Sequence, residues 1–267
     1  MTTVLASEVR KITTTRGWIV MMCITAAVAL GFSSIFAVIG LIGPGIGSGN
    51  VFTHPEFVRA IYTGNNQAAR VVAIIAGALM MGQEFRYKTL STSYLSVPHR
   101  TRMVGGKAIV TVGYGLVFGV VATVASFIVT AVFVLIKNGT LALDQGATWQ
   151  ALLLNIVAIA LWAMIGFGFG ILIKNMLASV LIAVGFAYII EPIINVIFTL
   201  NNWTVPAHLM PSSATSTLLG VDASSAIGAS TATGGSWPAW AGFLVLLGWA
   251  AIPAAVGIVT TVRQDVS

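Results

Sequence analysis

Residues 17–42 read GWIVMMCITAAVALGFSSIFAVIGLI and contain no Asp, Glu, Lys or Arg. A helix of about 20 apolar residues crosses a hydrocarbon core of about 30 Å, so this stretch is long and apolar enough to span a membrane. A secretory signal is the alternative for a run so close to the first residue. The run is longer than a usual signal core of about 7 to 15 residues, and we therefore interpret it as an uncleaved transmembrane helix.

Five more runs of this kind follow, at residues 66–85, 105–136, 150–173, 176–199 and 238–262. The run at 66–85 is the weakest, because it spans only if Arg70 extends its charged head to an interface. The whole chain is 57% hydrophobic and 7% charged, whereas soluble domains carry about 25% charged residues. The composition excludes soluble enzymes and nucleic-acid binders. It predicts an all-α polytopic membrane protein with six transmembrane helices, and we expect residues 1–267 to form one transmembrane domain.

The distribution of basic residues predicts the orientation in the membrane. Positive charges gather on the cytoplasmic side of membrane proteins, and this asymmetry is clear when both termini are cytoplasmic. The inner side then holds Arg10, Lys11, Arg16, Arg86, Lys88, Arg100, Arg102, Lys107, Lys174 and Arg263, and the outer side holds Arg59, Arg70 and Lys137. We expect a multi-pass protein of the cell membrane with cytoplasmic N- and C-termini.

Residues 1–16, ahead of the first span, have the pattern of a short amphipathic helix. Leu5, Val9 and Ile12 follow the i, i+4, i+7 spacing of one helix face, while the polar residues Ser7, Glu8, Arg10 and Lys11 point elsewhere on a helical wheel. Such a helix lies in the plane of the bilayer interface. A frayed, charged terminus is the alternative, because the segment is only about three turns long.

Residues 82–107, GQEFRYKTLSTSYLSVPHRTRMVGGK, form the most charged stretch of the chain. Leu90, Tyr94 and Val97 fall on one face of a helix that Pro98 would end. An apolar stripe on a cytoplasmic segment is typical of a surface that binds a protein partner. Docking of the same segment onto lipid headgroups through its bases is the alternative.

Two segments are predicted on the outer side. Residues 43–69 contain Pro44, Pro55 and His54, and we expect an ordered lid or short helix there. Residues 200–237 contain a single charged residue, Asp222. This extracellular segment is predicted to be partly re-entrant, because irregular backbone is tolerated at membrane depth only against protein. A flexible linker is the alternative.

The chain offers no recognisable catalytic or metal-binding set. Lys107 follows two glycines, but the remaining pattern of a phosphate loop is missing. His54, His99 and His208 stand apart in the sequence, and Cys23 is the single cysteine. We therefore expect no enzymatic activity, no catalytic residue, no metal site and no cofactor on this chain.

Glu191 is the clearest acidic residue within an apolar run, and Pro192 follows it. A carboxylate at such a position is costly and is usually paired or functional, so one interpretation is a proton or cation site. The other is a structural one, in which Glu191 caps a proline kink and reaches the outer interface. Small residues let helices approach closely in membranes, and we predict such contacts at Gly115, Gly119, Gly166, Gly168 and Gly170.

The order of these parts, together with two local stretches, resembles the ABC-2 type permeases, the membrane subunits of bacterial ABC exporters. The stretches are SEVRKITTTRGWIVM at residues 7–21 and QEFRYKTLSTSYLSVPHRTRMVGGKAIV at residues 83–110. The positions that match the family pattern are Glu84, Phe85, Arg86, Thr89, Pro98, Arg100, Lys107 and Ala108. The chain departs from that pattern at Gln83, where glycine is common, and at His99, where a basic residue is usual.

The resemblance implies a dimer of membrane subunits, formed by two copies or by a copy and a paralogue. It also implies two separate ABC ATPase subunits, which bind ATP and Mg²⁺. Residues 86–100 would form the cytoplasmic coupling segment between the second and third spans. The candidate ATPase-coupling residues are Glu84, Phe85, Arg86, Tyr87, Thr89, Leu90, Tyr94, Leu95, Val97, Pro98 and Arg100.

Spans two and five line the substrate path in the family that the chain resembles. The candidate path residues, chosen by residue type and span, are Phe32, Phe36, Met80, Phe186, Tyr188, Glu191, Asn195 and Phe198. Because charged residues are scarce in the spans, an amphipathic or hydrophobic cargo such as a drug, lipid-linked molecule or peptide is expected. The alternative function is a secondary transporter or channel that uses Glu191 for ion coupling.

Overall fold

The computed structural model describes residues 2–42, 50–87, 100–220 and 237–263. Within these ranges every regular element is helical, and six helices are long and apolar enough to cross a membrane. The predicted all-α fold class with six spans is confirmed. The chain is thus a multi-span membrane protein.

The predicted spans agree with the observed helices to within a few residues at most ends, and the second span is extended by α3. The elements are α1 (Thr2–Thr14), α2 (Gly17–Ile42), η1 (Val51–Thr53), α3 (Pro55–Gly64), α4 (Asn66–Arg86), α6 (Arg100–Ile136), α7 (Gly146–Leu172), α8 (Met176–Gly185), η2 (Phe186–Ile190), α9 (Glu191–Leu200), α10 (Thr204–His208), α11 (Pro211–Leu219) and α13 (Ala239–Arg263).

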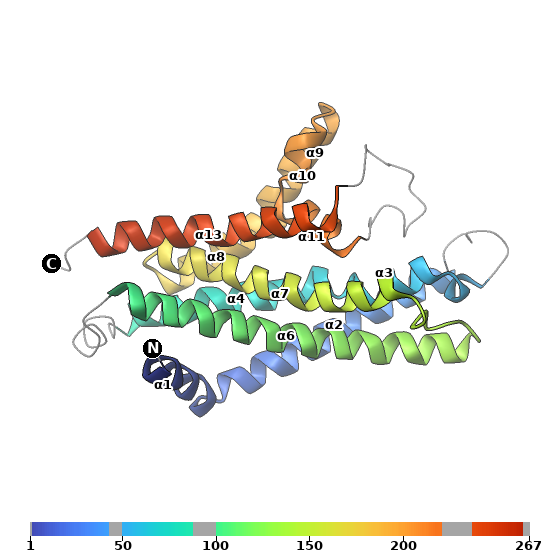
Figure 1. The fold of residues 1–267 in the computed structure, drawn as a ribbon, viewed down its shortest axis with the longest axis horizontal. Helices are drawn as coiled ribbons and strands as arrows, with labels where there is room; N and C mark the ends of the chain where they lie inside the picture. The colour runs from blue at the N-terminus through green and yellow to red at the C-terminus, as the bar shows by residue number, and fades with distance from the viewer. Residues whose placement is uncertain (1, 43–49, 88–99, 221–236, 264–267) are drawn as a thin grey trace.

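The long helices run side by side, as Figure 1 shows, and α7 packs against α4, α6 and α13. Its side chains Ile159, Trp162 and Phe167 are completely buried in the core. Helix α1 and the C-terminal end of α13 lie at the same end of the bundle (Figure 1). We call this the N-terminal end, and the end that carries α3 the distal end.

Glycines allow α4 and α7 to pack backbone against backbone. A Cβ atom on Gly77 would overlap the carbonyl oxygen of Ala163, and one on Gly166 would overlap that of Ile74. A Cβ on Gly170 would lie 2.8 Å from the carbonyl oxygen of Ala78. Gly115, Gly119 and Gly168 also lie against neighbouring helices. The close contacts predicted at Gly115, Gly119, Gly166, Gly168 and Gly170 are therefore confirmed. In a membrane, helices associate through close packing at small residues, because lipid is as apolar as the helix surface.

A buried polar network joins four helical segments near the break between α3 and α4. The side-chain amide of Asn155 on α7 donates to Asn65 Oδ1 at 3.2 Å and to Thr123 Oγ1 on α6 at 3.0 Å. Asn66 donates back to Asn155 Oδ1 at 3.0 Å. Asn65 also donates to Ser126, whose hydroxyl lies 2.5 Å from that of Ser33 on α2. Hydrogen bonds between spanning helices of this kind fix their register.

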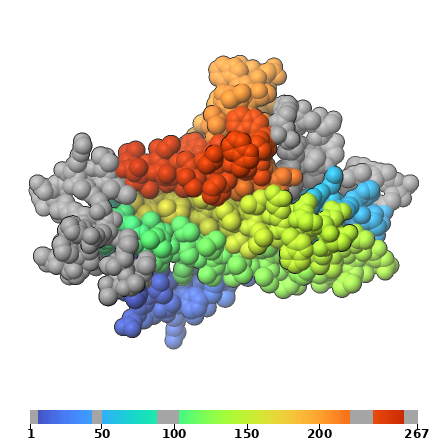
Figure 2. Space-filling view, viewed as in Figure 1, coloured from blue at the N-terminus to red at the C-terminus, as the bar shows by residue number. Residues whose placement is uncertain are grey.

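The fifth span is interrupted where Pro192 enters the helix. Proline has no N–H to donate and its ring collides with the carbonyl four residues earlier, and the π-helical turn η2 occurs directly before Glu191. Beyond it, α9 turns away from the bundle, and Figure 2 shows it projecting in orange together with α10. Ile193, Val196 and Leu200 are exposed, so this apolar surface implies contact with the lipid bilayer.

The described parts of the two predicted outer segments are helical. In the segment at 43–69, α3 buries Phe57 and Ile61, which confirms the short helix. In the segment at 200–237, α11 packs against α13 and α7 and buries Ala214 and Leu218. The flexible-linker alternative is therefore wrong for α10 and α11, and residues 221–236 lie outside the described part of the chain.

Candidate functional site

Four charged side chains from three helices meet at the N-terminal end of the bundle. Lys107 on α6 donates to Glu8 Oε2 on α1 at 2.6 Å and to Glu84 Oε1 on α4 at 2.8 Å. Lys11 on α1 donates to Oε1 of both carboxylates at 3.3 Å. We call these residues, Glu8, Lys11, Glu84 and Lys107, the charged cluster. It ties α1 to the end of the second span and the beginning of the third.

Burial makes the charged cluster sensitive to the loss of any partner. The side chain of Lys107 is 3% exposed, and Glu8 and Glu84 are buried as well. Removing one member of a buried ion pair leaves a desolvated charge without compensation. Lys11 is more exposed. Burial lowers its pKa, but the negative charges and hydrogen bonds of Glu8 and Glu84 outweigh this effect and raise the pKa of Lys11 above its usual range, so the amine stays charged at neutral pH.

The helix predicted ahead of the first span is confirmed as α1. Glu8, which was expected to lie off the apolar face of that helix, is buried against Lys107, while Val9 on the apolar face is exposed. The apolar side of α1 at Val9 thus remains free for lipid. The pair between Glu8 and Lys107 was missed because nothing in either local sequence indicates the other. The available signal was that each residue lies in one of the two stretches that carry the family resemblance.

The predicted coupling residues fall into two groups. Glu84 belongs to the charged cluster, and Phe85 is partly buried against the apolar cluster that contains Phe167. Arg86 and Tyr87 are exposed, and the Arg86 guanidinium lies 5.7 Å from the centroid of the Tyr87 ring. Arg100 is the first residue of α6. The other coupling residues, Thr89, Leu90, Tyr94, Leu95, Val97 and Pro98, lie outside the described residues. The charged cluster therefore links α4, which leads into the predicted coupling segment, to α6, which follows it.

Arg70 does not extend to an interface, so that prediction is wrong. Its side chain is only 5% exposed. Its Nε donates to the Tyr188 hydroxyl at 3.1 Å, and its guanidinium lies 4.9 Å from the ring centroids of both Trp162 and Tyr188. The Tyr188 hydroxyl in turn donates to the carbonyl of Gln67. Aromatic faces stabilise the cation, and this explains how a transmembrane helix retains it inside the protein.

Glu191 is completely buried, so its side chain does not extend to solvent in the way that the structural interpretation of this residue supposes. Its Oε1 accepts hydrogen bonds from the backbone N–H of Ser212 at 2.5 Å and from the Ser212 hydroxyl at 2.6 Å. This joins α9 to the N-terminus of α11, where the helix dipole favours a carboxylate. Its Oε2 and the buried Oδ1 of Asn195 have no hydrogen-bond partner among the described residues.

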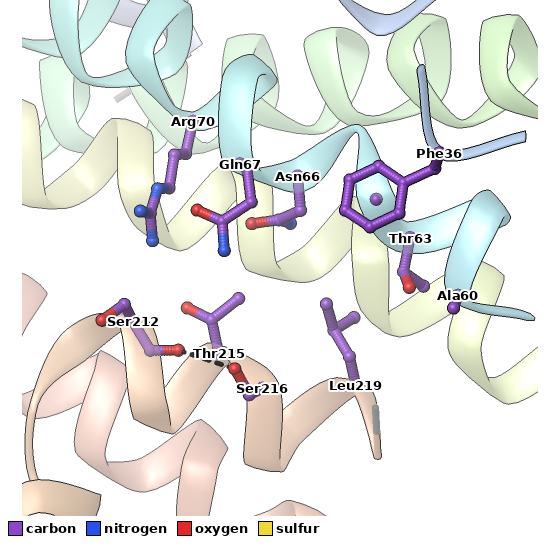
Figure 3. A pocket seen from close by; sticks show the side chains of 11 residues that line it. Phe36, Ala60, Thr63, Asn66, Gln67, Arg70, Ser212, Thr215, Ser216 and Leu219 are labelled. Carbon is purple, nitrogen blue, oxygen red and sulfur yellow. Dashed lines mark hydrogen bonds between the residues drawn. The ribbon is translucent and has the colours of Figure 1, made fainter. Parts of the chain in front are cut away.

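A pocket lies between the α3–α4 junction and α11, with Arg70 at one end and Phe36 of α2 at the other (Figure 3). Of the predicted path residues, Phe36 lines this pocket, and Tyr188 adjoins it through Arg70. The remaining path residues, Phe32, Met80, Phe186, Glu191, Asn195 and Phe198, do not line it. Arg70 and Trp162 were missed by sequence reasoning, because apolar spans and single charges do not reveal which aromatic rings surround a cation.

Within the described part of the chain, no three His, Cys, Asp or Glu side chains gather as metal ligands. No model of a known protein family matches the chain, and no curated protein matches it.

Proposed function

We propose that the chain is the membrane-spanning permease subunit of an ATP-driven ABC exporter of the ABC-2 type. In this proposal, a second membrane subunit, either another copy or a paralogue, completes the translocation path. Two soluble ATPase subunits bind ATP and Mg²⁺ and dock on residues 86–100. The cargo is an amphipathic or hydrophobic molecule, such as a drug, a lipid-linked molecule or a peptide.

The charged cluster is the observation that carries the proposal. It brings together residues 7–21 and 83–110, the two stretches that resemble the permease family, through contacts of Lys107 with Glu8 and Glu84. A permease needs a rigid connection between the segment that the ATPase moves and the helices that respond. Because Glu84 and Lys107 flank the predicted coupling segment on either side, a push on that segment is transmitted to α1, α4 and α6 together.

The exposed apolar surface gives further support. The first and fifth spans are the least buried of the six, and the fifth has exposed Ile189 and Ile193 on either side of Glu191. Lipid and a second membrane subunit both suit such surfaces, because neither hydrates them. ATP-driven closure of the ATPase pair would rock the spans about the subunit interface and change the side to which the path opens.

Loss of the ATPase is the expected result when the coupling stripe is made acidic. Leu90→Asp combined with Tyr94→Asp places two charges on the apolar face of the predicted helix, where burial against a partner would desolvate them. Recovery of the soluble ATPase with the affinity-purified membrane protein should fall at least about tenfold, at unchanged yield and chromatographic profile. Quantitative mass spectrometry of the purified complex measures the ratio.

The matched control uses the same charge on the other side of the same segment. Thr92→Asp combined with Ser96→Asp lies opposite the stripe on a helical wheel, and ATPase recovery should remain near the original level. The docking role of residues 86–100 would be contradicted if the unaltered protein and both double variants recovered equal amounts of ATPase. It would also be contradicted if none of the three co-purified with a phosphate-loop ATPase.

The second candidate function is a secondary transporter or channel, and the buried carboxylate of Glu191 favours it. Its Oε2 lacks a partner among the described residues, and such groups in membranes often mark ion paths. A secondary transporter should move substrate in liposomes that contain this chain alone, driven by an ion gradient without ATP. Glu191→Gln should abolish that activity, whereas Glu56→Gln, at an exposed position on α3, should not. Strict dependence of transport on ATP and on the ATPase subunit would reject this candidate.

A further inference from the structure

We propose that the pocket at Arg70 binds the anionic group, a carboxylate or phosphate, of an amphipathic molecule. This inference extends the proposed function. The claim that the bound molecule is the cargo rests on the proposal that the chain is an exporter subunit. The binding itself is argued from the pocket alone and can be measured without an ATPase.

Arg70 supplies a positive charge that the described part of the protein does not neutralise by contact. No carboxylate among the described residues lies within 4.0 Å of its nitrogens, and its hydrogen bond to Tyr188 uses Nε alone. The guanidinium is a planar fork that suits two oxygens of a carboxylate or phosphate. Buried charges in membrane proteins are normally paired or functional, so an anion is the missing partner.

Aromatic contacts hold the guanidinium in a fixed orientation. Trp162 and Tyr188 contribute ring faces at equal centroid distances of 4.9 Å, and Trp162 is itself fixed by donating from Nε1 to Thr215 Oγ1 at 3.0 Å. Figure 3 shows the Arg70 head pointing from α4 toward Ser212 and Thr215 on α11. A cation that is already ordered loses less freedom when it binds an anion.

The charge of Glu191 interacts with that of Arg70, but neither carboxylate oxygen of Glu191 lies within 4.0 Å of an Arg70 nitrogen, so the two residues form no direct ion pair. The Oε1 atom of Glu191 is occupied by the backbone N–H and the hydroxyl of Ser212. Tyr188, which also faces Arg70, donates its hydroxyl proton to the carbonyl of Gln67. An anion in the pocket would therefore meet Arg70 without displacing the link between α9 and α11.

The lining of the pocket has a polar part and an apolar part. The polar side chains that line the pocket are those of Thr63, Asn66, Gln67, Arg70, Ser212, Thr215 and Ser216. In Figure 3, Gln67, Ser212 and Thr215 lie on the Arg70 side. At the end away from Arg70, Phe36, Ala60 and Leu219 supply apolar surface, and Thr63 lies between Phe36 and Ala60 in Figure 3. The cavity volume of about 60 Å³ suits a single anionic group, whereas drug-sized ligands occupy about 300 to 1,000 Å³. The polar end thus fits a head group, and the apolar end fits the first carbons of a chain.

The test compares four probes that differ in whether they carry an anionic group and whether they carry an alkyl chain. Isothermal titration of the purified protein in a neutral maltoside detergent would use dodecyl phosphate, dodecanoate, dodecanol and inorganic phosphate. Both anionic amphiphiles should bind at least tenfold more tightly than dodecanol and than inorganic phosphate. Equal binding of dodecanol would overturn the anion site. Equal binding of inorganic phosphate would show a site for a free anion and would overturn the amphipathic ligand.

Substitutions then assign the binding to Arg70. Arg70→Gln should weaken dodecyl phosphate at least tenfold, and Arg70→Lys should weaken it less, because lysine keeps the charge but loses the fork. The matched control is Arg59→Gln on α3, a residue outside the pocket lining, which should leave the affinity unchanged. An equal loss in the Arg59 and Arg70 variants would overturn the assignment.

A measurement on the unaltered protein covers the case in which Arg70→Gln does not fold. A photoreactive dodecyl phosphate with a diazirine near its head should label peptides that contain Phe36 or Leu219, and excess dodecanoate should suppress the labelling. Labelling confined to other helices would overturn the site. If these peptides are labelled but no ATPase co-purifies, the binding inference stands and the exporter proposal fails. If an ATPase co-purifies without anion binding, the reverse holds.

Discussion

Lys107→Met is expected to destabilise the protein by about 3 to 5 kcal/mol, the usual cost of removing one partner from a buried ion pair. The substitution leaves the carboxylates of Glu8 and Glu84 buried near each other, and Lys11, the other cation of the charged cluster, is more exposed. The free energy of unfolding, measured by denaturant titration in mild detergent, should fall by this amount. In the proposed exporter, in which the charged cluster transmits the coupling motion, stimulation of the ATPase subunits by cargo should fall as well.

Two further variants show whether the loss comes from unpaired charge. Lys107→Met combined with Glu8→Gln and Glu84→Gln removes the charges together and should recover much of the lost stability, since an uncharged replacement of a buried ionic group is often tolerated. Lys137→Met, at an exposed lysine, should change stability by less than about 0.5 kcal/mol. If Lys107→Met lowered the free energy of unfolding by less than about 1 kcal/mol, the charged cluster would not stabilise the protein as predicted.

Gly166→Ala is expected to cost about 3 kcal/mol, the upper part of the usual range for overpacking. The new methyl group would overlap the carbonyl oxygen of Ile74 and approach its carbonyl carbon at 2.8 Å. Both atoms belong to a backbone that is held in a helix, so α4 and α7 must move apart to accept it. Thermal unfolding of the purified protein should shift to a lower temperature, and the yield of folded protein should fall.

The matched control has the opposite expected sign. Gly113 on α6 has no atom within 4 Å of the position that a Cβ would occupy. Alanine favours a helix over glycine by about 1 kcal/mol, so Gly113→Ala should leave stability unchanged or raise it slightly. If the two variants behaved alike, the contact between α4 and α7 would not limit stability in the way that the geometry indicates.

The glycine contacts show what a local sequence pattern can predict about helix packing and what it cannot. The sequence predicted that Gly166 and Gly170 approach a neighbouring helix, because small residues in apolar runs have few other uses. It did not identify α4 as that neighbour, nor did it single out Gly77, which completes the contact from the other side. The partner of a helix face depends on the arrangement of all six spans, and a single run carries no information about it.

The sequence by itself determined the class of protein and the six spans. Hydropathy is a property of consecutive residues, and a helix needs about 20 apolar residues to cross the hydrocarbon core of a bilayer. The tertiary structure alone decided which charges are paired. Glu8 and Lys107 are 99 positions apart and Arg70 and Tyr188 are 118 apart. A charge in an apolar run indicates that compensation is needed, but only packing in three dimensions decides whether an interface, a carboxylate or an aromatic ring supplies it.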